Sequence, residues 1–226
     1  LFSTQDVTDT KTELNAIECS TNAQVDDAIV QISTIMDKFY KKAEGKKFSA
    51  RNNPDTYYLT ATNTEIQATK SALDAEGVFE LKYNGNKKFY LHGIYNDTYV
   101  NKPEDSSTAP TTSDNPVNDW YVGILDGNTN KVYFANEMSG YNSIHFNDIY
   151  KPYSTCGWLY DEQKSQWTIS SVSDAKYEEL ATWKNLDNAI ATSEQYTIGT
   201  GFGQYTASTN YETALADAKA IAEAHS

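Results

Sequence analysis

The sequence has 226 residues and an excess of acidic side chains, 31 Asp and Glu against 18 Lys and Arg, for a net charge of -13. A surface this acidic repels phosphate groups and anionic lipid head groups, so nucleic acid and anionic membranes are not expected as partners. The chain contains no run of about 18 apolar residues, so no membrane span is expected. It begins at Leu1 rather than Met, which indicates a processed or truncated product.

The N-terminal region is predicted to be an extended arm followed by an amphipathic helix. Residues 1–19 are polar and lack a clear hydrophobic period, which favours the arm. Residues 21–44 are predicted to be helical, because Thr21 and Gln24 have the spacing of a capping box. We expect this helix to pack on a sheet of the same chain, since its polar face is acidic rather than basic. The apolar positions recur at steps of four and three, at Val25, Ile29, Ile32, Met36 and Phe39.

A β-sheet is predicted for residues 77–171, after a weaker helix at 63–75. Pairs of β-rich runs around short polar turns are typical of hairpins, and successive hairpins indicate an antiparallel, meander-like sheet. The three expected hairpins are residues 78–93 around Asn84-Gly85, residues 120–136 around Asp126-Gly127, and the strands 157–160 and 166–171.

Two further segments complete the predicted organisation. Residues 101–119 contain three prolines and many Ser and Thr residues, which is typical of a long mobile loop, with a domain boundary as the alternative. Residues 173–224 are predicted to be a C-terminal helical region. We therefore expect one α+β domain over residues 1–226, in which the N-terminal and C-terminal helices pack on the sheet.

The chain has two cysteines, Cys19 and Cys156. They could be free buried thiols of a cytosolic protein or form one disulfide in an oxidising compartment. The abundance of Ser, Thr, Asn and Tyr favours the disulfide, as does a glycosylation sequon at Asn96, Asp97 and Thr98. The sequence therefore predicts an extracellular protein, either secreted or at the cell surface.

Catalytic motifs are scarce. The chain has only three histidines, and neither an H-E-x-x-H nor a G-x-S-x-G motif is present. Paired carboxylates of a glycoside hydrolase need not be close in sequence, so that reading stays open as a third alternative. We expect a protein that is not an enzyme and has no cofactor.

A calcium site is a second candidate. Asp126, Asn128, Asn130 and Glu137 stand at positions one, three, five and twelve of an EF-hand loop, where oxygen ligands are required. Position six is Lys131 instead of the usual glycine. An Asp-Gly hairpin turn explains the same residues and is the favoured interpretation.

Exposed aromatic rings are the third candidate, because sugar-binding modules stack such rings on pyranose faces. Trp120, Tyr121, Trp158 and Trp167 are the positions selected as ligand-binding residues. Alternation along a strand, however, places Ile169 beside Trp167 and Leu159 opposite Trp158, which favours burial of these two tryptophans. The wider set of aromatic candidates also includes Tyr133, Tyr141, Tyr150, Tyr153 and Tyr160.

The order of the aromatic motifs resembles a module of secreted and cell-surface proteins of algae and other protists. The motifs, between Gly77 and Ser170, are G-V-F-E-x-x-Y-N-G-N-K-K-F-Y-x-x-G, D-W-Y-V-G-I, Y-F-A-N, P-x-x-x-C-G-W and W-x-I-S. Lys87 stands where this module often has proline. The resemblance implies an extracellular β-rich domain without assigned catalytic residues.

These observations favour a secreted, non-enzymatic structural or adhesive protein, such as a self-assembling subunit of an extracellular filament, sheath or extruded matrix. The polar N-terminal arm and the alanine-faced C-terminal helix would then contact neighbouring copies or other extracellular proteins. The alternative is a carbohydrate-binding module that presents Trp and Tyr rings to glycans.

Overall fold

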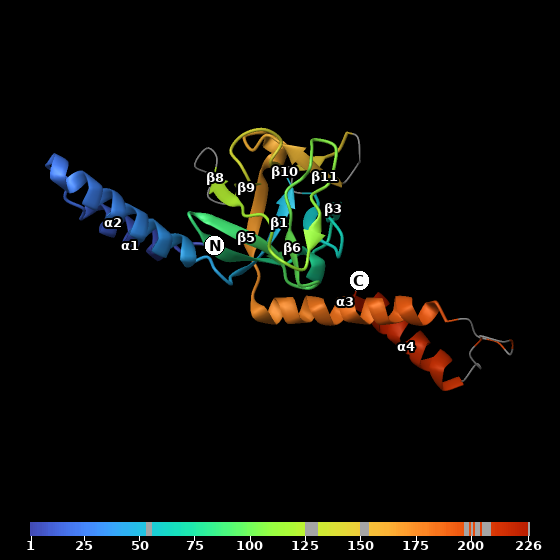
Figure 1. The fold of residues 1–226 in the computed structure, drawn as a ribbon. Helices are drawn as coiled ribbons and strands as arrows, with labels where there is room; N and C mark the ends of the chain where they lie inside the picture. The colour runs from blue at the N-terminus through green and yellow to red at the C-terminus, as the bar shows by residue number, and fades with distance from the viewer. Residues whose placement is uncertain are drawn as a thin grey trace. The chain divides into compact units, whose positions relative to one another are not determined.

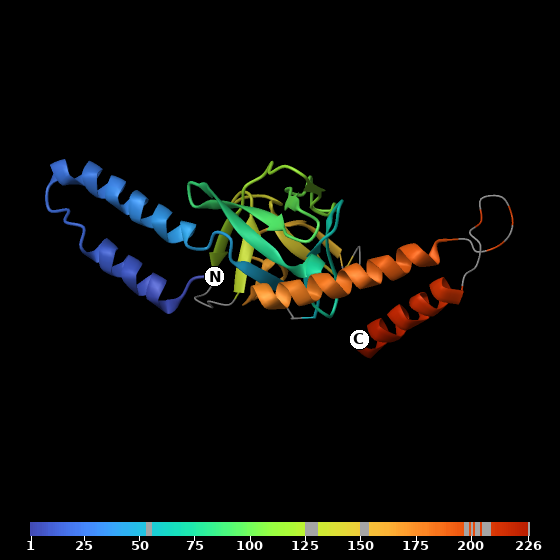
Figure 2. The same ribbon diagram turned by 90° about the horizontal axis from the view of Figure 1, so that it is seen from below.

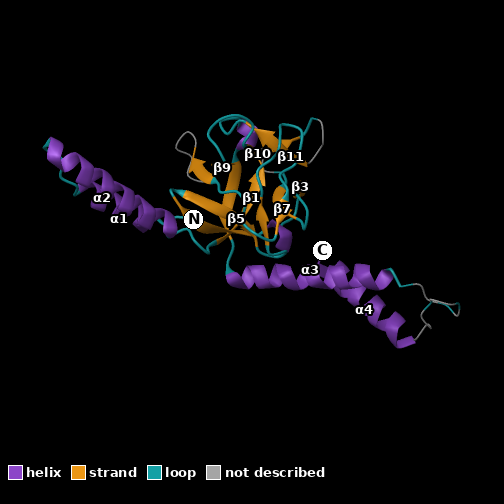
Figure 3. Ribbon diagram, viewed as in Figure 1, coloured by secondary structure: helices purple, strands orange, loops and turns teal. Residues whose placement is uncertain are grey.

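A computed structural model describes residues 1–52, 56–124, 131–149, 154–196, 199, 201, 204 and 209–225. It has an α+β architecture with a large antiparallel sheet (Figure 1; Figure 3). The chain forms two compact units, residues 1–173 and residues 174–226, where the sequence predicted a single domain. The division arises because the two C-terminal helices, α3 and α4, pack against each other as a helical hairpin.

The first unit begins with two helices, α1 (Thr4–Asn15) and α2 (Asn22–Lys41), that lie side by side (Figure 2). The predicted extended arm is therefore wrong. A capping box starts α1, because the Asp6 N–H donates to Ser3 Oγ and the Ser3 N–H donates to Asp6 Oδ2. The apolar period of α1 is too short to recognise in the sequence, but its Thr10 is buried in the fold.

Helix α2 lies within the predicted helical segment, and Gln24 Oε1 accepts a hydrogen bond from the Thr21 N–H at its start. Its packing differs from the prediction. Only its C-terminal end contacts the sheet, through the Tyr40 ring 6.0 Å from Phe89 and a hydrogen bond from Tyr83 Oη to Asp37. The rest of α2 packs on α1 instead, because that neighbouring helix covers the buried Ala28 side of the apolar face.

Twelve strands follow in the described part of the first unit. Their bounds, in chain order, are β1 (Lys47–Asn52), β2 (Tyr58–Ala61), β3 (Ile66–Lys70), β4 (Phe79–Gly85), β5 (Lys88–Gly93), β6 (Thr98–Val100), β7 (Thr112–Ser113), β8 (Tyr121–Ile124), β9 (Lys131–Ala135), β10 (Ser143–Asn147), β11 (Ser154–Trp158) and β12 (Trp167–Ser171).

Six of these strands close into a barrel. β1 pairs with β4 and β12, β4 with β5, β8 with β9, and β9 with β12, while a bridge between Phe89 and Trp120 joins the β5 and β8 segments. The other six strands form the pairs β2–β3, β6–β7 and β10–β11. Each successive set of four strands thus contributes two barrel strands and one hairpin, and this repeated connectivity defines a β-trefoil.

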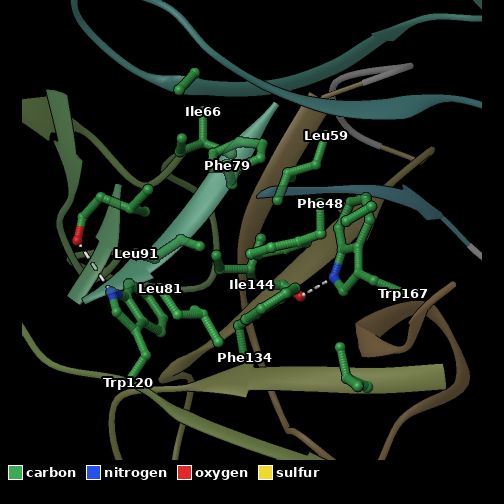
Figure 4. Packing of buried hydrophobic residues seen from close by; sticks show 14 of the residues in the cluster. Phe48, Leu59, Ile66, Phe79, Leu81, Leu91, Trp120, Phe134, Ile144 and Trp167 are labelled. Atoms are coloured by element: carbon green, nitrogen blue, oxygen red, sulfur yellow. Dashed lines mark hydrogen bonds between the residues drawn. The ribbon is translucent and has the colours of Figure 1, made fainter. Parts of the chain in front are cut away.

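The barrel core contains one equivalent pair of residues from each of the three sets of four strands. In each set, the second residue of the first strand pairs with a buried aromatic residue at the start of the fourth strand or next to it. Trp120 and Trp167 each donate an indole N–H to a backbone carbonyl, Val100 O at 3.0 Å and Ile144 O at 2.9 Å (Figure 4). Buried indole groups need such partners, so these bonds lock both rings in the core. The three pairs are Phe48 with Phe79, Phe89 with Trp120, and Val132 with Trp167.

Two of the three predicted hairpins are present, as β4–β5 and β8–β9. In the first, Gly85 pairs with Lys88, so the turn residues are Asn86 and Lys87, both with positive φ, rather than Asn84 and Gly85. The second turn, around Asp126-Gly127, lies outside the described residues. The third hairpin is wrong, because β11 pairs with β10 and β3 while β12 pairs with β9 and β1.

Two other segments also differ from expectation. The helix predicted at 63–75 contains strand β3, whose buried Ile66 and Ala68 alternate with Gln67. Pairing with β2 and β11 outweighs the weak helical pattern there. The 101–119 segment contains β7, and its Pro110 carbonyl accepts from the Ile66 N–H, so part of the predicted loop belongs to the sheet.

The second unit consists of α3 (Asp174–Glu194) and α4 (Thr209–His225), within the predicted helical region. The Trp183 and His225 rings stack at 3.6 Å, and Tyr211 Oη donates to the Ser193 carbonyl. No helix among the described residues has the length and apolarity that a membrane crossing requires.

Candidate functional site

Two of the selected aromatic residues are not available to a ligand. Trp120 and Trp167 are both 0% exposed and belong to the barrel core. Their selection as ligand-binding residues is therefore wrong, whereas the expected burial of Trp167 is confirmed. The cause is the barrel closure, which pairs Trp120 with Phe89 and Trp167 with Val132 and so encloses both rings among barrel strands.

Tyr121 is half-buried on the outside of strand β8. Lys88 Nζ lies 4.5 Å from the centre of its ring and 2.9 Å from Asp119 Oδ1. A cation already covers one face of this ring, so that face is occupied within the protein. Tyr121 is consequently a poor platform for an added ligand.

The predicted disulfide is wrong. Cys19 is exposed in the link between α1 and α2, and Cys156 is buried in strand β11, and both are free thiols. The helical hairpin holds its linking segment away from the strand, so the two sulfur atoms do not meet. Burial raises the pKa of Cys156 to about 11, with Asp105 adding a smaller effect, so this thiol stays protonated and unreactive at neutral pH.

The sequon side chains are engaged in the fold. Asn96 Nδ2 donates to the Ala61 carbonyl at 2.9 Å, and Thr98 is buried. Attachment of a glycan would replace one of the two Nδ2 hydrogens of Asn96, and the other could keep this hydrogen bond.

The predicted calcium ligands Asp126, Asn128 and Asn130 lie outside the described residues, and the fourth, Glu137, is exposed after strand β9. Within the described ranges, no group of three His, Cys, Asp or Glu side chains is arranged to hold a metal ion. The flanking segments are strands rather than helices.

The remaining selected residue, Trp158, belongs to a surface cluster that we call the aromatic site: Tyr141, His145 and Trp158. Trp158 is half-buried at the end of β11, and Tyr141 is 49% exposed. The Tyr141 ring centre lies 5.1 Å from the Trp158 ring centre, at an interplanar angle of 36°. The His145 ring, on strand β10 of the β10–β11 hairpin, lies 5.7 Å from the Trp158 ring centre. The three rings form a partly exposed apolar platform.

Gly157 explains how the chain segments around this platform come together. An added Cβ at this position would lie 2.4 Å from the Tyr141 carbonyl oxygen and 2.7 Å from the Asp105 carbonyl oxygen. Both contacts are to backbone, which cannot move aside as a flexible side chain can. The absent side chain thus lets the Tyr141 segment and the Asp105 loop approach strand β11 next to Trp158.

The loop whose Asp105 backbone approaches Gly157 also carries the Asp105 carboxylate. Its Oδ1 accepts hydrogen bonds from the Ser107 N–H at 2.7 Å and the Thr108 N–H at 2.9 Å, and these bonds lower its pKa. The group is ionised at neutral pH. An ionised carboxylate next to aromatic rings can accept hydrogen bonds from the hydroxyl groups of a ligand that stacks on the rings.

His145 is neutral under the same conditions. Burial, with a smaller contribution from Lys164, lowers its pKa to about 4. Its Nδ1 lies 2.9 Å from Ser165 Oγ, and the serine hydroxyl donates in turn to the Leu159 carbonyl. Because that hydroxyl proton is committed to Leu159, the geometry fits a His145 that donates from Nδ1 to Ser165.

Sequence reasoning selected Trp158 while favouring its burial, and it included Tyr141 among the aromatic candidates, but it did not select His145 or Asp105. The only signal for Asp105 was the D-S-S-T run, which is typical of an Asx turn. Its position next to β11 depends on the close approach at Gly157, which no local pattern reveals.

No protein-family model and no curated protein matches this sequence. Several solved structures resemble it over a little more than half of its length. A BEL β-trefoil in an apo crystal form has 11% identity and a TM-score of 0.49, covering 57% of this chain and 95% of that one. A ricin B-like lectin from Macrolepiota procera in complex with lactose has 14% identity and a TM-score of 0.48, with 56% and 96% covered. SeviL bound to the asialo-GM1 saccharide has 6% identity and a TM-score of 0.47, with 57% and 98% covered.

Proposed function

We propose that this chain is a non-catalytic carbohydrate-binding protein and that the aromatic site contacts the glycan. The observation that carries the proposal is the pair of partly exposed rings, Tyr141 and Trp158, 5.1 Å apart beside the ionised Asp105 loop. A pyranose has apolar C–H faces and a rim of hydroxyl groups. Rings that present an apolar face next to a hydrogen-bond acceptor match both features.

The chemistry of the site supports binding rather than hydrolysis. His145, with its pKa lowered to about 4, is a weak base at neutral pH. Asp105 has a lowered pKa and is held by three hydrogen bonds from Ser107 and Thr108, so it is unsuited to act as a protonated acid. A general acid for glycoside cleavage requires the opposite shift, a raised carboxyl pKa.

A glycan array on the full chain, followed by calorimetric titration of the best ligand, tests the proposal. Trp158→Ala and Tyr141→Ala are each expected to weaken binding by at least about tenfold, since stacking on a ring is lost. Asp105→Asn keeps the loop geometry and is expected to weaken binding less. Tyr90→Ala is the matched control, because Tyr90 also forms an aromatic pair, with Tyr99, on another part of the barrel.

Two results would refute this function: the absence of any glycan bound by the folded chain, or full binding by the Trp158→Ala and Tyr141→Ala variants. The proposal includes an extracellular location, because the acidic, hydroxyl-rich composition and the resemblance to the secreted protist module both favour it. Detection of the native protein in culture medium or on intact cells by antibody labelling tests that part separately.

A second candidate function is self-association as a structural or adhesive subunit. The observation that favours it is the exposed apolar stripe of α2, where Val25, Ile29 and Ile32 are 41%, 58% and 42% exposed. These positions recur at steps of four and three, so they share one helix face. A second copy of the chain is the partner that this candidate requires.

Sedimentation velocity over a range of protein concentrations tests self-association. Wild-type protein is expected to show a concentration-dependent dimer or larger species, and Ile29→Asp is expected to abolish it because a charge enters the stripe. Val117→Asp is the matched control, since Val117 is 67% exposed but lies in the loop between β7 and β8. A monomer at all concentrations, or an unchanged assembly of Ile29→Asp, would exclude α2 as the contact.

A further inference from the structure

The first unit contains a cavity of about 560 Å³ between the N-terminal helical hairpin and one end of the barrel. The apolar barrel side chains that line it include Phe48, Val122, Val132 and Ile169. They come from β1, β8, β9 and β12, at the end where β1 and β9 begin and where β8 and β12 finish. Phe2 and Phe39, whose rings stack at 4.2 Å, line the cavity from the helical side.

The cavity is partly open, and its volume lies within the range of about 300–1,000 Å³ that is typical of small-molecule sites. Water would find few hydrogen-bond partners among these apolar side chains. The described polar side chains at the cavity include Ser170 and Ser171, both exposed at the end of β12. An apolar molecule is therefore the occupant that this lining favours.

The charges near the Leu1 side of the cavity indicate the head group of that molecule. Lys42 and Lys46 both approach one carboxylate, Asp6, at 3.2 Å and 3.9 Å, and Lys46 Nζ also donates to the Leu1 carbonyl at 2.8 Å. Among these three side chains, two ammonium groups share one carboxylate, so their summed charge is positive by one. An anionic head group could pair with it while an alkyl chain enters the apolar cavity.

We propose that this cavity binds a long-chain fatty acid or a similar anionic amphiphile, with the alkyl chain against the barrel end and the head group near Lys46. The site is separate from the aromatic site and does not depend on glycan binding. It would give the protein a second ligand of a different chemical class, held where the helical hairpin meets the barrel.

Fluorescence titration of the full chain with cis-parinaric acid tests the proposal. We expect a saturable increase at one site, displaced by palmitate and at least about tenfold less well by hexadecanol, which has the same chain without the charge. Ile169→Trp, which fills the cavity, is expected to weaken parinarate binding by at least about tenfold. Val117→Trp, in the exposed loop between β7 and β8, is the matched control and is expected to bind as wild type does.

Further variants test the cavity and the head-group contact separately. If circular dichroism shows that Ile169→Trp does not fold, Val122→Phe fills the same space with a smaller change. Lys46→Gln is expected to reduce the preference for palmitate over hexadecanol, and Trp158→Ala is expected to leave parinarate binding unchanged. No saturable signal, or wild-type affinity in a folded cavity-filling variant, would overturn the proposal; equal displacement by palmitate and hexadecanol would overturn its anionic head group.

Discussion

Trp158 and Trp167 belong to the same four-strand unit of the β-trefoil and yet have opposite surroundings. Trp167 is fully buried, donates its indole N–H to Ile144 O, and fills the barrel core. Trp158 is half-buried and lies against Tyr141 and His145 on the β10–β11 hairpin. The comparison shows that residue type alone does not separate buried from partly exposed tryptophans in this protein. The position on a barrel strand or on a hairpin strand separates them.

The largest expected effect is on stability, from truncation of the buried ring. Trp167→Ala is expected to lower the free energy of unfolding by about 3–5 kcal/mol, because it opens a cavity and leaves the Ile144 carbonyl without its donor. Trp158→Ala is expected to lower it by less than about 2 kcal/mol, since its ring is partly solvated. Urea denaturation followed by circular dichroism measures both values. Similar losses of unfolding free energy for the two variants would contradict the assignment of Trp167 to the core and of Trp158 to the surface.

A smaller effect is expected at Gly157, which lets neighbouring segments approach Trp158. Gly157→Ala places a methyl group against the Tyr141 and Asp105 carbonyl oxygens, and we expect a loss of about 1–3 kcal/mol from the resulting backbone shift. Glycan binding should weaken as well, because the platform and the acidic loop move apart. Leu159→Ala, two residues along the chain and 38% exposed at the wild-type side chain, is the control. Unchanged stability of Gly157→Ala would show that the close approach is not required.

The smallest expected effect is a pH dependence of the free energy of unfolding that arises from His145 in the aromatic site. The pKa of His145 is lowered to about 4, so between pH 6.5 and 4 the unfolded chain binds a proton that the folded chain does not. Stability is expected to fall as pH drops through this window, by about 1–2 kcal/mol once solvent screening of the partly exposed ring is allowed for.

His145→Gln should remove this part of the pH dependence while carboxylates elsewhere continue to titrate. Lys164 and Asp148 face the same ring and pair with each other, so both should be kept intact in the comparison. Denaturant titrations of wild type and variant at several pH values measure the difference. Parallel curves for the two proteins would show that His145 does not contribute.

Local patterns in the sequence predicted the elements whose partners are close along the chain. The α2 periodicity and its Thr21–Gln24 cap predicted that helix, and the runs around residues 78–93 and 120–136 predicted the β4–β5 and β8–β9 hairpins. Helix α1 also had a local signal, the Ser3–Asp6 capping box, which was obscured by the polar composition of the segment.

Other predictions failed because long-range pairing decided the outcome. Strands β11 and β12 are neighbours in sequence but not in the sheet, since β12 is needed to close the barrel against β1 and β9. The helix predicted at 63–75 failed for a similar reason, because the residues of β3 pair with β2 and β11. The Cys19–Cys156 bond was inferred from composition, and composition contains no information about which thiols meet.

The sequence by itself determined the α+β class, the first amphipathic helix, two hairpins and the abundance of aromatic side chains, because these depend on periodicity and turn chemistry over a few residues. Only the tertiary structure decided which tryptophans are buried and which rings remain partly exposed. It also brought the Asp105 loop against Gly157 and formed the cavity at the barrel end. The physical reason is that barrel closure joins strands distant in sequence, and burial follows from those distant partners rather than from neighbouring residues.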